Sequence, residues 1–470
     1  MSHKMQFKLP LIIFSSIPFL FTTSAYSAGF ALIENSASGM GNAFAGASAV
    51  AEDSSTVWFN PAGMTYLAEA LNGKAQVSSS GHILSTSTKF TDKGTSAPAS
   101  LLSTIDGVKD SDEGHNGLIP NIYYVKQLKP RLSFGVSVNA PFGSGNEYDE
   151  DWVGRYQATK TAMKTINVNP SLSWKANDKF SIGGGISAQY IHVSLGKALD
   201  SAAACRSIAI AGGSTAIWNN VCNTQYPNAS KVEKDSQVLV EGDDISFGFN
   251  LGLLYQPTQK TRLGASYRSS IKHDLEGDIK FDLHAGLKSI VPALEAKDVK
   301  RLSNRGITAS VDLPETISLS LVHQINPRLE LLGDVTWMNW SSFPELRIND
   351  AETGDTVTNT PEEWEDVARF SLGANYKYND KLTLRTGVAL DEEAIPSEKL
   401  RTPRTSGNDR TWLSFGAGYK MNKKTTFDFG YSHLFLDETA IDNTDEAGYT
   451  VKGLYDTSVN IYSAQVNYNF

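Results

Sequence analysis

The sequence predicts an all-β transmembrane barrel of 14 antiparallel strands, with a mostly helical amino-terminal plug, or hatch, inside the lumen. Three observations lead to this fold: the alternating pattern of the last strand, a regular succession of short turns and long loops, and a Gly/Ala-rich segment before the first strand.

The carboxy-terminal segment from Tyr462 to Phe470 alternates apolar and polar residues without a break. Such alternation is typical of a strand with one apolar face and one wet face. An aromatic last residue looks like the end of the closing strand of a bacterial outer-membrane barrel. We therefore expect the barrel assembly machinery of the outer membrane to be a partner of this strand.

The amino terminus has the features of a secretory signal peptide. Two lysines precede an apolar run from Leu9 to Phe21, and the small residues Ala25 and Ser27 follow. An uncleaved membrane anchor is the alternative, but the run contains two prolines and is shorter than the roughly 20 residues that a spanning helix needs. We predict a signal peptide at 1–27 and a mature chain that starts at Ala28.

Short polar connections alternate along the chain with long polar stretches. The short ones, rich in Pro, Asn, Asp and Lys, are 126–131, 175–179, 256–261, 325–328, 378–381 and 420–424. The long ones are about 91–116, 145–162, 195–243, 284–313, 349–363, 392–409 and 437–450. A barrel whose two termini lie on the same side has half as many long loops as strands, and one short turn fewer than loops. Seven loops and six turns therefore both correspond to 14 strands.

This alternation also predicts the orientation, with long loops outside the cell and both termini in the periplasm. A soluble β-sandwich, the alternative, does not account for alternating loop lengths.

The segment 28–71 lacks strand alternation and is rich in Gly, Ala and Ser, so we expect short helices that fill the wide lumen of the barrel at 72–470. It contains Asn60, Pro61 and Ala62. Asparagine favours the cap before a helix and proline favours its first position. By itself this motif predicts only a turn.

Composition excludes several functions. Asp and Glu number 51 against 42 Lys and Arg, which argues against nucleic acid as a partner. Cys205 and Cys222 share one polar stretch of an exported chain, so we expect a loop disulfide. A metal site is the alternative, but there is no CxxC pair. We find no Gly-x-Ser-x-Gly and no His-Glu-x-x-His, and we expect no enzyme activity, no cofactor and no metal.

Several segments together carry a family resemblance. They are Ala28-Gly29-Phe30, Gly39-Met40-Gly41, Glu52-Asp53, Asn60-Pro61-Ala62, Gly154-Arg155-Tyr156-Gln157, Ser341-Ser342-Phe343, Leu384 to Ala389 and the final strand. The chain resembles the FadL/TodX family of outer-membrane transporters for long-chain fatty acids and aromatic hydrocarbons, over essentially the whole mature length. The resemblance implies a monomeric barrel with a hatch. It also implies capture of a hydrophobic molecule among the outer loops, hatch displacement and lateral release into the bilayer.

Lateral release needs a local break in strand pairing. The expected third strand, 132–145, is interrupted by Pro141, Phe142 and Gly143. Proline donates no ladder hydrogen bond, and glycine often marks a bulge. We hypothesise that these three residues frame a lateral opening. The alternative is that Pro141 only begins the next loop.

A fatty acid carboxylate needs a cation in an otherwise apolar cavity. Arg369 and Arg385 face the lumen by strand parity and are the candidates. An ion pair between Arg369 and Glu365 is the alternative. Glu365 stands where fatty-acid members of the family carry a lysine, which leaves room for an uncharged hydrocarbon. A general porin for small polar solutes would give no role to the segment 28–71.

The acidic outer stretches 110–113 and 147–151 could bridge lipopolysaccharide phosphates through divalent cations. Solvated loop charge is the alternative explanation. Outer-membrane lipid and lipopolysaccharide are therefore expected partners.

Overall fold

The structure is a computed structural model that describes residues 29–98, 104–112, 114, 116–227, 231–291 and 300–470. The expected signal peptide at 1–27 and Ala28 lie outside the described residues.

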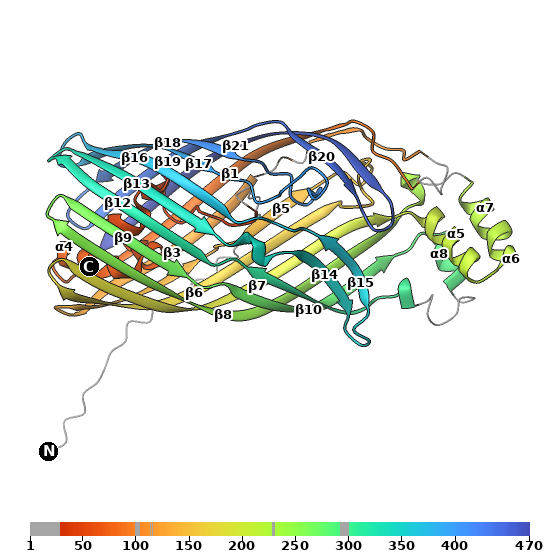
Figure 1. The fold of residues 1–470 in the computed structure, drawn as a ribbon, viewed down its shortest axis with the longest axis horizontal. Helices are drawn as coiled ribbons and strands as arrows, with labels where there is room; N and C mark the ends of the chain where they lie inside the picture. Colours follow the sequence, from red (N-terminus) through yellow and green to blue (C-terminus); the bar gives the residue numbers. More distant parts are fainter. Residues whose placement is uncertain (1–28, 99–103, 113, 115, 228–230, 292–299) are drawn as a thin grey trace, which may run out of the picture.

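The described residues form one closed antiparallel β-barrel around an amino-terminal hatch (Figure 1). The strands are β1 (Gln76–Asp92), β2 (Asp110–Asp112), β3 (Asn116–Lys129), β4 (Leu132–Asn139), β5 (Gly143–Glu147), β6 (Lys160–Asn177), β7 (Phe180–Leu199), β8 (Ser236–Thr258), β9 (Thr261–Arg268), β10 (Ile271–Asp282) and β11 (Arg305–Leu313). They continue with β12 (Thr316–Asn326), β13 (Leu329–Met338), β14 (Glu345–Asp350), β15 (Thr356–Pro361), β16 (Val367–Lys377), β17 (Leu382–Asp391), β18 (Arg410–Lys420), β19 (Thr425–Leu436), β20 (Thr439–Thr444) and β21 (Thr450–Asn469).

The expected strand number is confirmed. Successive strands pair with one another, and β1 pairs with β21 from Gln76 opposite Asn469 to Asp92 opposite Gly453, which closes the cylinder. Six barrel strands are each divided into two segments: β4 and β5, β9 and β10, β11 and β12, β13 and β14, β15 and β16, and β19 and β20. With each divided strand counted once and the short β2 left aside, the barrel has 14 antiparallel strands.

The six expected turns all lie at one end of the barrel, which we call the turn end, and the long connections lie at the other, the loop end (Figure 1). The carboxy terminus lies at the turn end. Asn and Asp side chains close these turns; Asn326, for example, accepts from the Arg328 and Leu329 amides.

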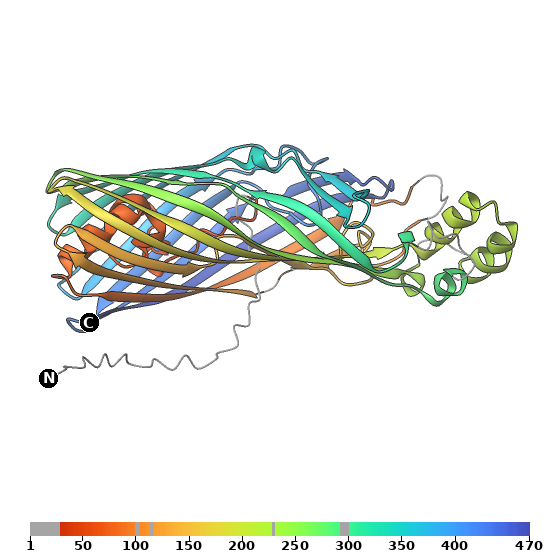
Figure 2. The ribbon, with the colours of Figure 1, turned by 90° about the horizontal axis from the view of Figure 1, so that it is seen from below.

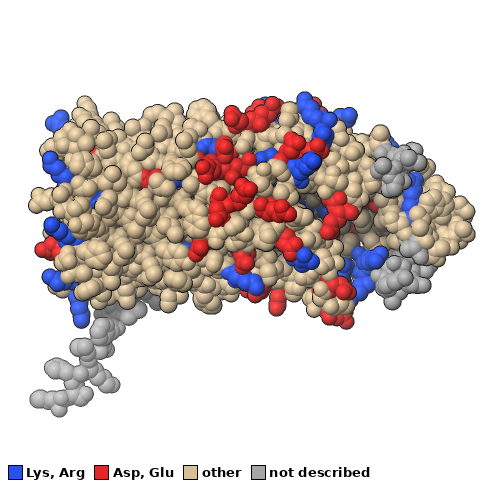
Figure 3. Space-filling view, in the orientation of Figure 1, with Lys and Arg blue, Asp and Glu red and all other residues tan. Residues whose placement is uncertain are grey.

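Strand parity separates an outer apolar face from a polar lumen. On β16, Phe370 and Leu372 are 47% and 68% exposed, whereas Arg369 and Ser371 are buried in the lumen. Figure 3 shows a broad belt of the outer surface with few charges, between a rim of Lys and Arg at the turn end and acidic residues nearer the loop end. Such a belt is the lipid-facing surface of a transmembrane barrel.

The hatch lies in the half of the lumen near the turn end (Figure 2). It consists of α1 (Ala37–Met40), α2 (Ala47–Val50), α3 (Thr56–Phe59), the 3-10 turn η1 (Pro61–Gly63) and α4 (Met64–Ala70). The ladder begins at Gln76 rather than near Asn72. Asn72 and Gly73 have φ angles of 53° and 77°, and this left-handed turn separates α4 from β1.

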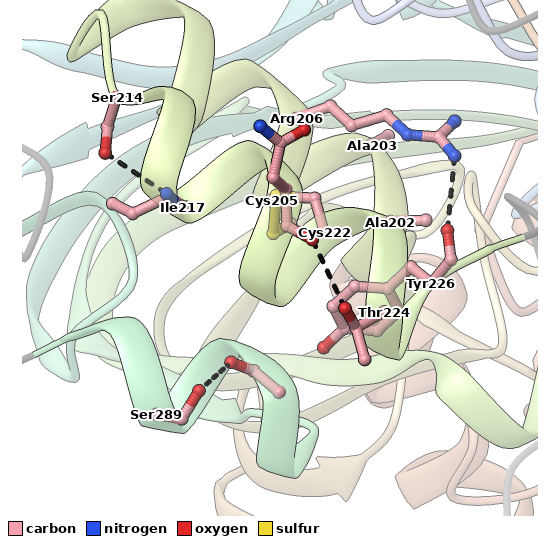
Figure 4. The surroundings of a disulfide bond; sticks show 12 residues. Ala202, Ala203, Cys205, Arg206, Ser214, Ile217, Cys222, Thr224, Tyr226 and Ser289 are labelled. Carbon is pink, nitrogen blue, oxygen red and sulfur yellow. Dashed lines mark hydrogen bonds between the residues drawn. A yellow bond between two sulfur atoms is a disulfide. The ribbon is translucent and has the colours of Figure 1, made fainter.

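Helices also form beyond the loop end of the wall (Figures 1 and 2). They are α5 (Ser201–Ala211), α6 (Thr215–Ile217), the π-helical turn η3 (Trp218–Cys222), α7 (Asn223–Gln225) and α8 (Ala285–Ile290), with a 3-10 turn at η4 (Val232–Lys234). A further 3-10 turn, η6 (Trp340–Ser342), lies within the wall between β13 and β14. The Cys205 and Cys222 sulfurs are bonded at 2.07 Å and join α5 to η3 (Figure 4). No helix among the described residues is long and apolar enough to span a membrane.

Candidate functional site

The ladder of the barrel wall is interrupted between β4 and β5. β3 pairs with β4 as far as Ile122 opposite Val138, and the described pairing of β5 is with β6 alone. Pro141 lies in this interruption and has no N–H to contribute to a ladder. The structure therefore places Pro141 and its neighbours at a break in strand pairing, beside the long strand β3.

The first described residues of the hatch line this break from the inside. The Leu32 N–H donates to the Pro141 carbonyl at 2.8 Å, and the Gly143 N–H donates to the Phe30 carbonyl at 2.9 Å. Asn35 adds a polar anchor, because its carbonyl accepts from the Tyr123 hydroxyl at 2.7 Å. The amino-terminal segment thus forms one antiparallel bridge, between Ala31 and Phe142, against the edge of the break.

The Phe30 side chain is held by a group of aromatic rings that we call the aromatic cage: Trp340, Phe343 and Trp364. Their ring centroids lie 4.7, 5.5 and 5.2 Å from that of Phe30. Trp340 also lies 6.3 Å from Phe142, edge to face. The cage therefore connects the amino-terminal segment to the break in the wall.

A cavity of about 120 Å³ lies in the lumen next to this segment. Its apolar lining includes Leu32, Ile33, Phe44, Phe59, Pro141, Phe142 and Met338, and its charged lining is Arg268, Asp334, Arg369 and Asp391.

A second hollow, of about 180 Å³, lies on the other side of the break. It is lined by Ala140, Phe142 and side chains of β6 and β7 that include the 37% exposed Ile166. Phe142 lines both spaces. Its side chain therefore separates the luminal cavity from the outer, lipid-facing hollow.

The lumen between this cavity and the loop end is apolar. Buried residues from several strands pack there with the aromatic cage: Met163, Ile191, Val238, Leu275, Ile279, Ile307, Ala309, Val311, Leu313 and Ile348. We call this set the apolar lumen cluster. Its composition differs from that of a water-filled pore, whose interior is polar.

The two arginines singled out from the sequence are both in the lumen but differ in their surroundings. Arg369 lines the cavity, and its guanidinium donates to Ser371 Oγ at 2.5 Å and to the Ala43 carbonyl at 3.0 Å. Arg385 is bound by two carboxylates, Asp428 at 2.8 Å and Glu52 of the hatch at 3.1 Å. Arg385 is not among the residues that line the cavity.

The alternative of an ion pair between Arg369 and Glu365 is wrong. Glu365 is exposed and precedes β16, so strand parity does not extend to it. The carboxylates that act on the Arg369 guanidinium are instead Asp391 and Asp334.

The motif at Asn60 fixes the hatch to the wall. The Asn60 side chain accepts from the Ala62 amide at 3.0 Å and caps η1, which begins at Pro61. Its amide group donates to the Ser48 carbonyl at 2.7 Å and to the Leu253 carbonyl of β8 at 2.9 Å. A Cβ at Gly252 would lie 2.0 Å from Asn60 Oδ1, so the close approach requires glycine.

Other polar contacts hold the hatch at several points. Gln465 of the last strand accepts from the Ala37 amide at 2.9 Å and donates to Asp53 Oδ2 at 2.9 Å. The polar face of the closing strand therefore packs on the hatch. Glu34 is also buried, and the loss of water raises the pKa of this carboxyl to about 7.

Comparison with known proteins agrees with this architecture. The family model described as "Outer membrane protein transport protein (OMPP1/FadL/TodX)" matches residues 19–470. The chain belongs to the FadL/TodX family. Members of this family are outer-membrane transporters of hydrophobic compounds, which places the protein among outer-membrane transport proteins.

Individual relatives cover nearly the whole chain. The long-chain fatty acid transport protein of Escherichia coli O6:H1 is 29% identical over 423 residues, 88% of each protein. A solved FadL homologue from Pseudomonas aeruginosa superposes with a TM-score of 0.81 at 26% identity, covering 94% of this chain and all of that one. The Pseudomonas putida toluene transporter TodX has a TM-score of 0.61 at 18% identity, covers 87% and 92%, and shows the same fold.

In this FadL/TodX member, sequence reasoning missed the aromatic cage and the second arginine of the cavity lining, Arg268. The alternation of β9 could have indicated Arg268 as a luminal residue. Arg268 shares a face of this strand with Gly264 and Ser266, both of which lie next to Ser48 of the hatch. The cage had no such signal, since Trp340 and Trp364 lie outside regular strands.

Proposed function

We propose that the protein carries long-chain fatty acids passively across the outer membrane and releases them sideways through the break at Pro141, Phe142 and Gly143. The loop end faces outward, both termini lie in the periplasm, and the barrel acts as a monomer. A molecule captured among the outer loops passes the apolar lumen cluster, reaches the cavity and leaves past Phe142.

The position of Phe142 carries this proposal. One side chain separates a luminal cavity from a hollow on the lipid-facing side, at a point where the wall has no continuous ladder. A small movement of this ring would join the two spaces. The luminal cavity of about 120 Å³ is below the ~300–1,000 Å³ of typical ligand pockets, so a long acyl chain requires such a movement.

The movement that we propose for the hatch is confined to its first residues, about 29–33, because Asn35 is anchored to the wall by Tyr123 and Asn139. Asn60, Asp53 and Glu52 tie the later part of the hatch to the wall through buried hydrogen bonds and an ion pair. The first residues are held mainly by the packing of Phe30 and by two backbone hydrogen bonds. Displacing them breaks fewer polar contacts than displacing the whole hatch.

A general porin is the weaker alternative. The apolar lumen cluster offers polar solutes no favourable path, and the hatch occupies the half of the lumen near the turn end. Water-filled porins keep a polar interior.

The nature of the ligand rests on a smaller set of observations. The name of the Escherichia coli relative supports a fatty acid, and the presence of Arg369 at the cavity supports a carboxylate. Arg385 is the weaker candidate, because two carboxylates already bind it. Uncharged or aromatic hydrocarbons using the same route are the alternative. Two further contacts remain predictions. They are the contact of the acidic loops with lipopolysaccharide and the contact of β21 with the barrel assembly machinery.

A reversible cross-link tests the lateral route. Ala31 and Phe142 face each other in an antiparallel bridge. The backbone hydrogen bonds of this bridge are made by the residues on either side, Leu32 with Pro141 and Gly143 with Phe30. Ala31 and Phe142 are therefore a non-hydrogen-bonded pair, whose Cβ atoms lie close enough for a disulfide. We expect A31C/F142C to stop oleate uptake when oxidised and to regain it on reduction, in cells that lack their own fatty acid transporter.

The matched control is T386C/F415C, which joins a facing pair on β17 and β18 away from the break. Wild-type protein treated with the same reductant controls for the native disulfide. Undiminished oleate uptake by the oxidised A31C/F142C protein would exclude this exit. A parallel assay with radiolabelled toluene separates fatty acid from hydrocarbon transport.

A further inference from the structure

The luminal cavity contains a cation whose charge the wall and the hatch leave uncompensated. Arg268 is the last residue of β9, where that strand breaks before β10, and its side chain lines the cavity. Its guanidinium carbon lies 3.3 Å from the ring centroid of Trp58, and Nη2 donates to the Trp58 carbonyl at 2.7 Å. Nη1 is buried without a hydrogen-bond partner.

Three other buried arginines are paired with acids. Arg385 has Glu52 and Asp428, Arg410 has Asp391 at 3.6 Å, and Arg155 has Asp235 at 2.7 Å. In the part of the chain that the structure describes, Arg268 forms no ion pair within 4.0 Å. Arg369, the second arginine of the cavity lining, also forms no ion pair within 4.0 Å among the described residues, but its guanidinium donates to Ser371 Oγ and to the Ala43 carbonyl.

An unpaired cation out of water is costly to a folded protein, and such groups are normally matched by a counter-charge. Stacking on Trp58 offsets part of this cost, because a guanidinium over an indole ring gains a cation–π attraction. It also holds the planar group in one orientation. A guanidinium that is held in one orientation and keeps Nη1 without a partner is suited to bind a carboxylate through charge-assisted hydrogen bonds.

The rest of the cavity fits the tail of such a ligand. Leu32, Ile33, Phe44 and Phe59 provide apolar lining, and Phe142 closes the side toward the lipid. The lining also contains two acids, and both have partners of their own. Asp334 accepts from Ser318, Ser320 and Thr336, and Asp391 pairs with Arg410 at 3.6 Å. A carboxylate at Arg268 would thus place an acyl chain next to the exit.

We infer that Arg268 is a specificity-determining residue of the luminal cavity, in addition to Arg369, and binds the terminal carboxylate of an anionic amphiphile. The inference rests on the proposed function and narrows its ligand to a charged class. Trp58 acts as a positioning residue that keeps the guanidinium flat against the hatch.

Binding of two probes with the same tail, oleate and oleyl alcohol, tests this role in the purified full-length protein. We expect Arg268→Met to weaken oleate binding at least tenfold and to change oleyl alcohol binding less than twofold. Arg268→Lys, which keeps the charge, should retain most of the preference for oleate. Arg347→Met, at an exposed ion pair with Glu345, is the matched control and should leave both affinities unchanged.

Arg268→Gln, which can still donate to the Trp58 carbonyl, serves if the methionine variant does not fold. An unchanged ratio of oleate to oleyl alcohol affinity in a folded, uncharged variant would overturn the inference and leave hydrophobic transport intact. Failure of the wild-type protein to bind either probe would instead overturn the proposed function.

Discussion

The phenyl ring of Phe30 packs edge-on against the indole of Trp340, with ring centroids 4.7 Å apart. This contact joins the start of the hatch to the barrel wall, because Trp340 lies in η6, which interrupts the divided strand between β13 and β14. The same indole lies 6.3 Å from Phe142. The Trp340 indole therefore contacts both Phe30 of the amino-terminal segment and Phe142, the ring at the lateral break.

Truncating Phe30 should release the amino-terminal segment. Replacing a buried Phe by Ala typically costs about 3–5 kcal/mol, and here the loss falls on a segment held by few polar contacts. We expect Phe30→Ala to speed hydrogen exchange of the Leu32 amide and to raise basal oleate uptake. Phe370→Ala, which removes a lipid-facing ring from β16, is the control and should do neither. Equal exchange at Leu32 in both variants would contradict the role of the cage.

The ion pair of Arg385 should hold the hatch in place. Removing one partner of a buried pair usually costs about 3–5 kcal/mol, because the other charge stays behind unpaired. Arg385→Met should therefore lower the free energy of unfolding and increase protease access to the hatch. Arg347→Met, which breaks the exposed pair with Glu345, should cost no more than about 1 kcal/mol. Similar losses in the two variants would show that the buried pair does not fasten the hatch.

The disulfide should stabilise the helices at the loop end without supporting the barrel. Cys205 and Cys222 are 17 residues apart, and closing a loop of that length is worth about 3 kcal/mol in the chain-entropy model. We expect C205S/C222S to be cleaved faster by protease between α5 and β8, while the barrel keeps its resistance to unfolding in detergent. Loss of the folded barrel on gels run without heating would show a wider role for this bond.

Alkaline pH should destabilise the aromatic cage through Glu362. Burial raises the pKa of this carboxyl to about 8 from its ordinary value of 4.5, and Trp364 of the aromatic cage donates to it at 3.0 Å. The folded protein therefore holds a proton that the unfolded chain loses above pH 4.5. The free energy of unfolding should fall as pH rises from about 4.5 to 8.

Glu362→Gln is neutral at every pH and keeps an acceptor for Trp364. We expect the thermal midpoint of the wild type to drop more than that of E362Q between pH 5 and pH 9. The exposed neighbour provides the control, Glu363→Gln, which should follow the wild type. Identical pH profiles for wild type and E362Q would show that Glu362 does not titrate in this range.

The sequence by itself determined the barrel, its 14 strands and the lipid-facing side of several of them, such as β16. These properties follow from local patterns: a period of two along a strand, and turn residues between strands. The sequence also indicated a hatch, because residues 28–71 carry no such period, and helices form there at 37–70. The start of the first strand at Gln76 was not visible in the sequence. It depends on the left-handed backbone of Asn72 and Gly73, which ends the hatch before the ladder begins.

Only the tertiary structure decided which luminal arginines are paired with an acid. Parity places Arg268, Arg369 and Arg385 alike in the lumen, but their partners come from distant parts of the chain. Glu52 reaches Arg385 across 333 positions in the sequence, whereas Arg268 receives an aromatic ring and a carbonyl from Trp58. The energy of a charge depends on the nearest counter-charge and on access to water, and both are set by packing across the lumen.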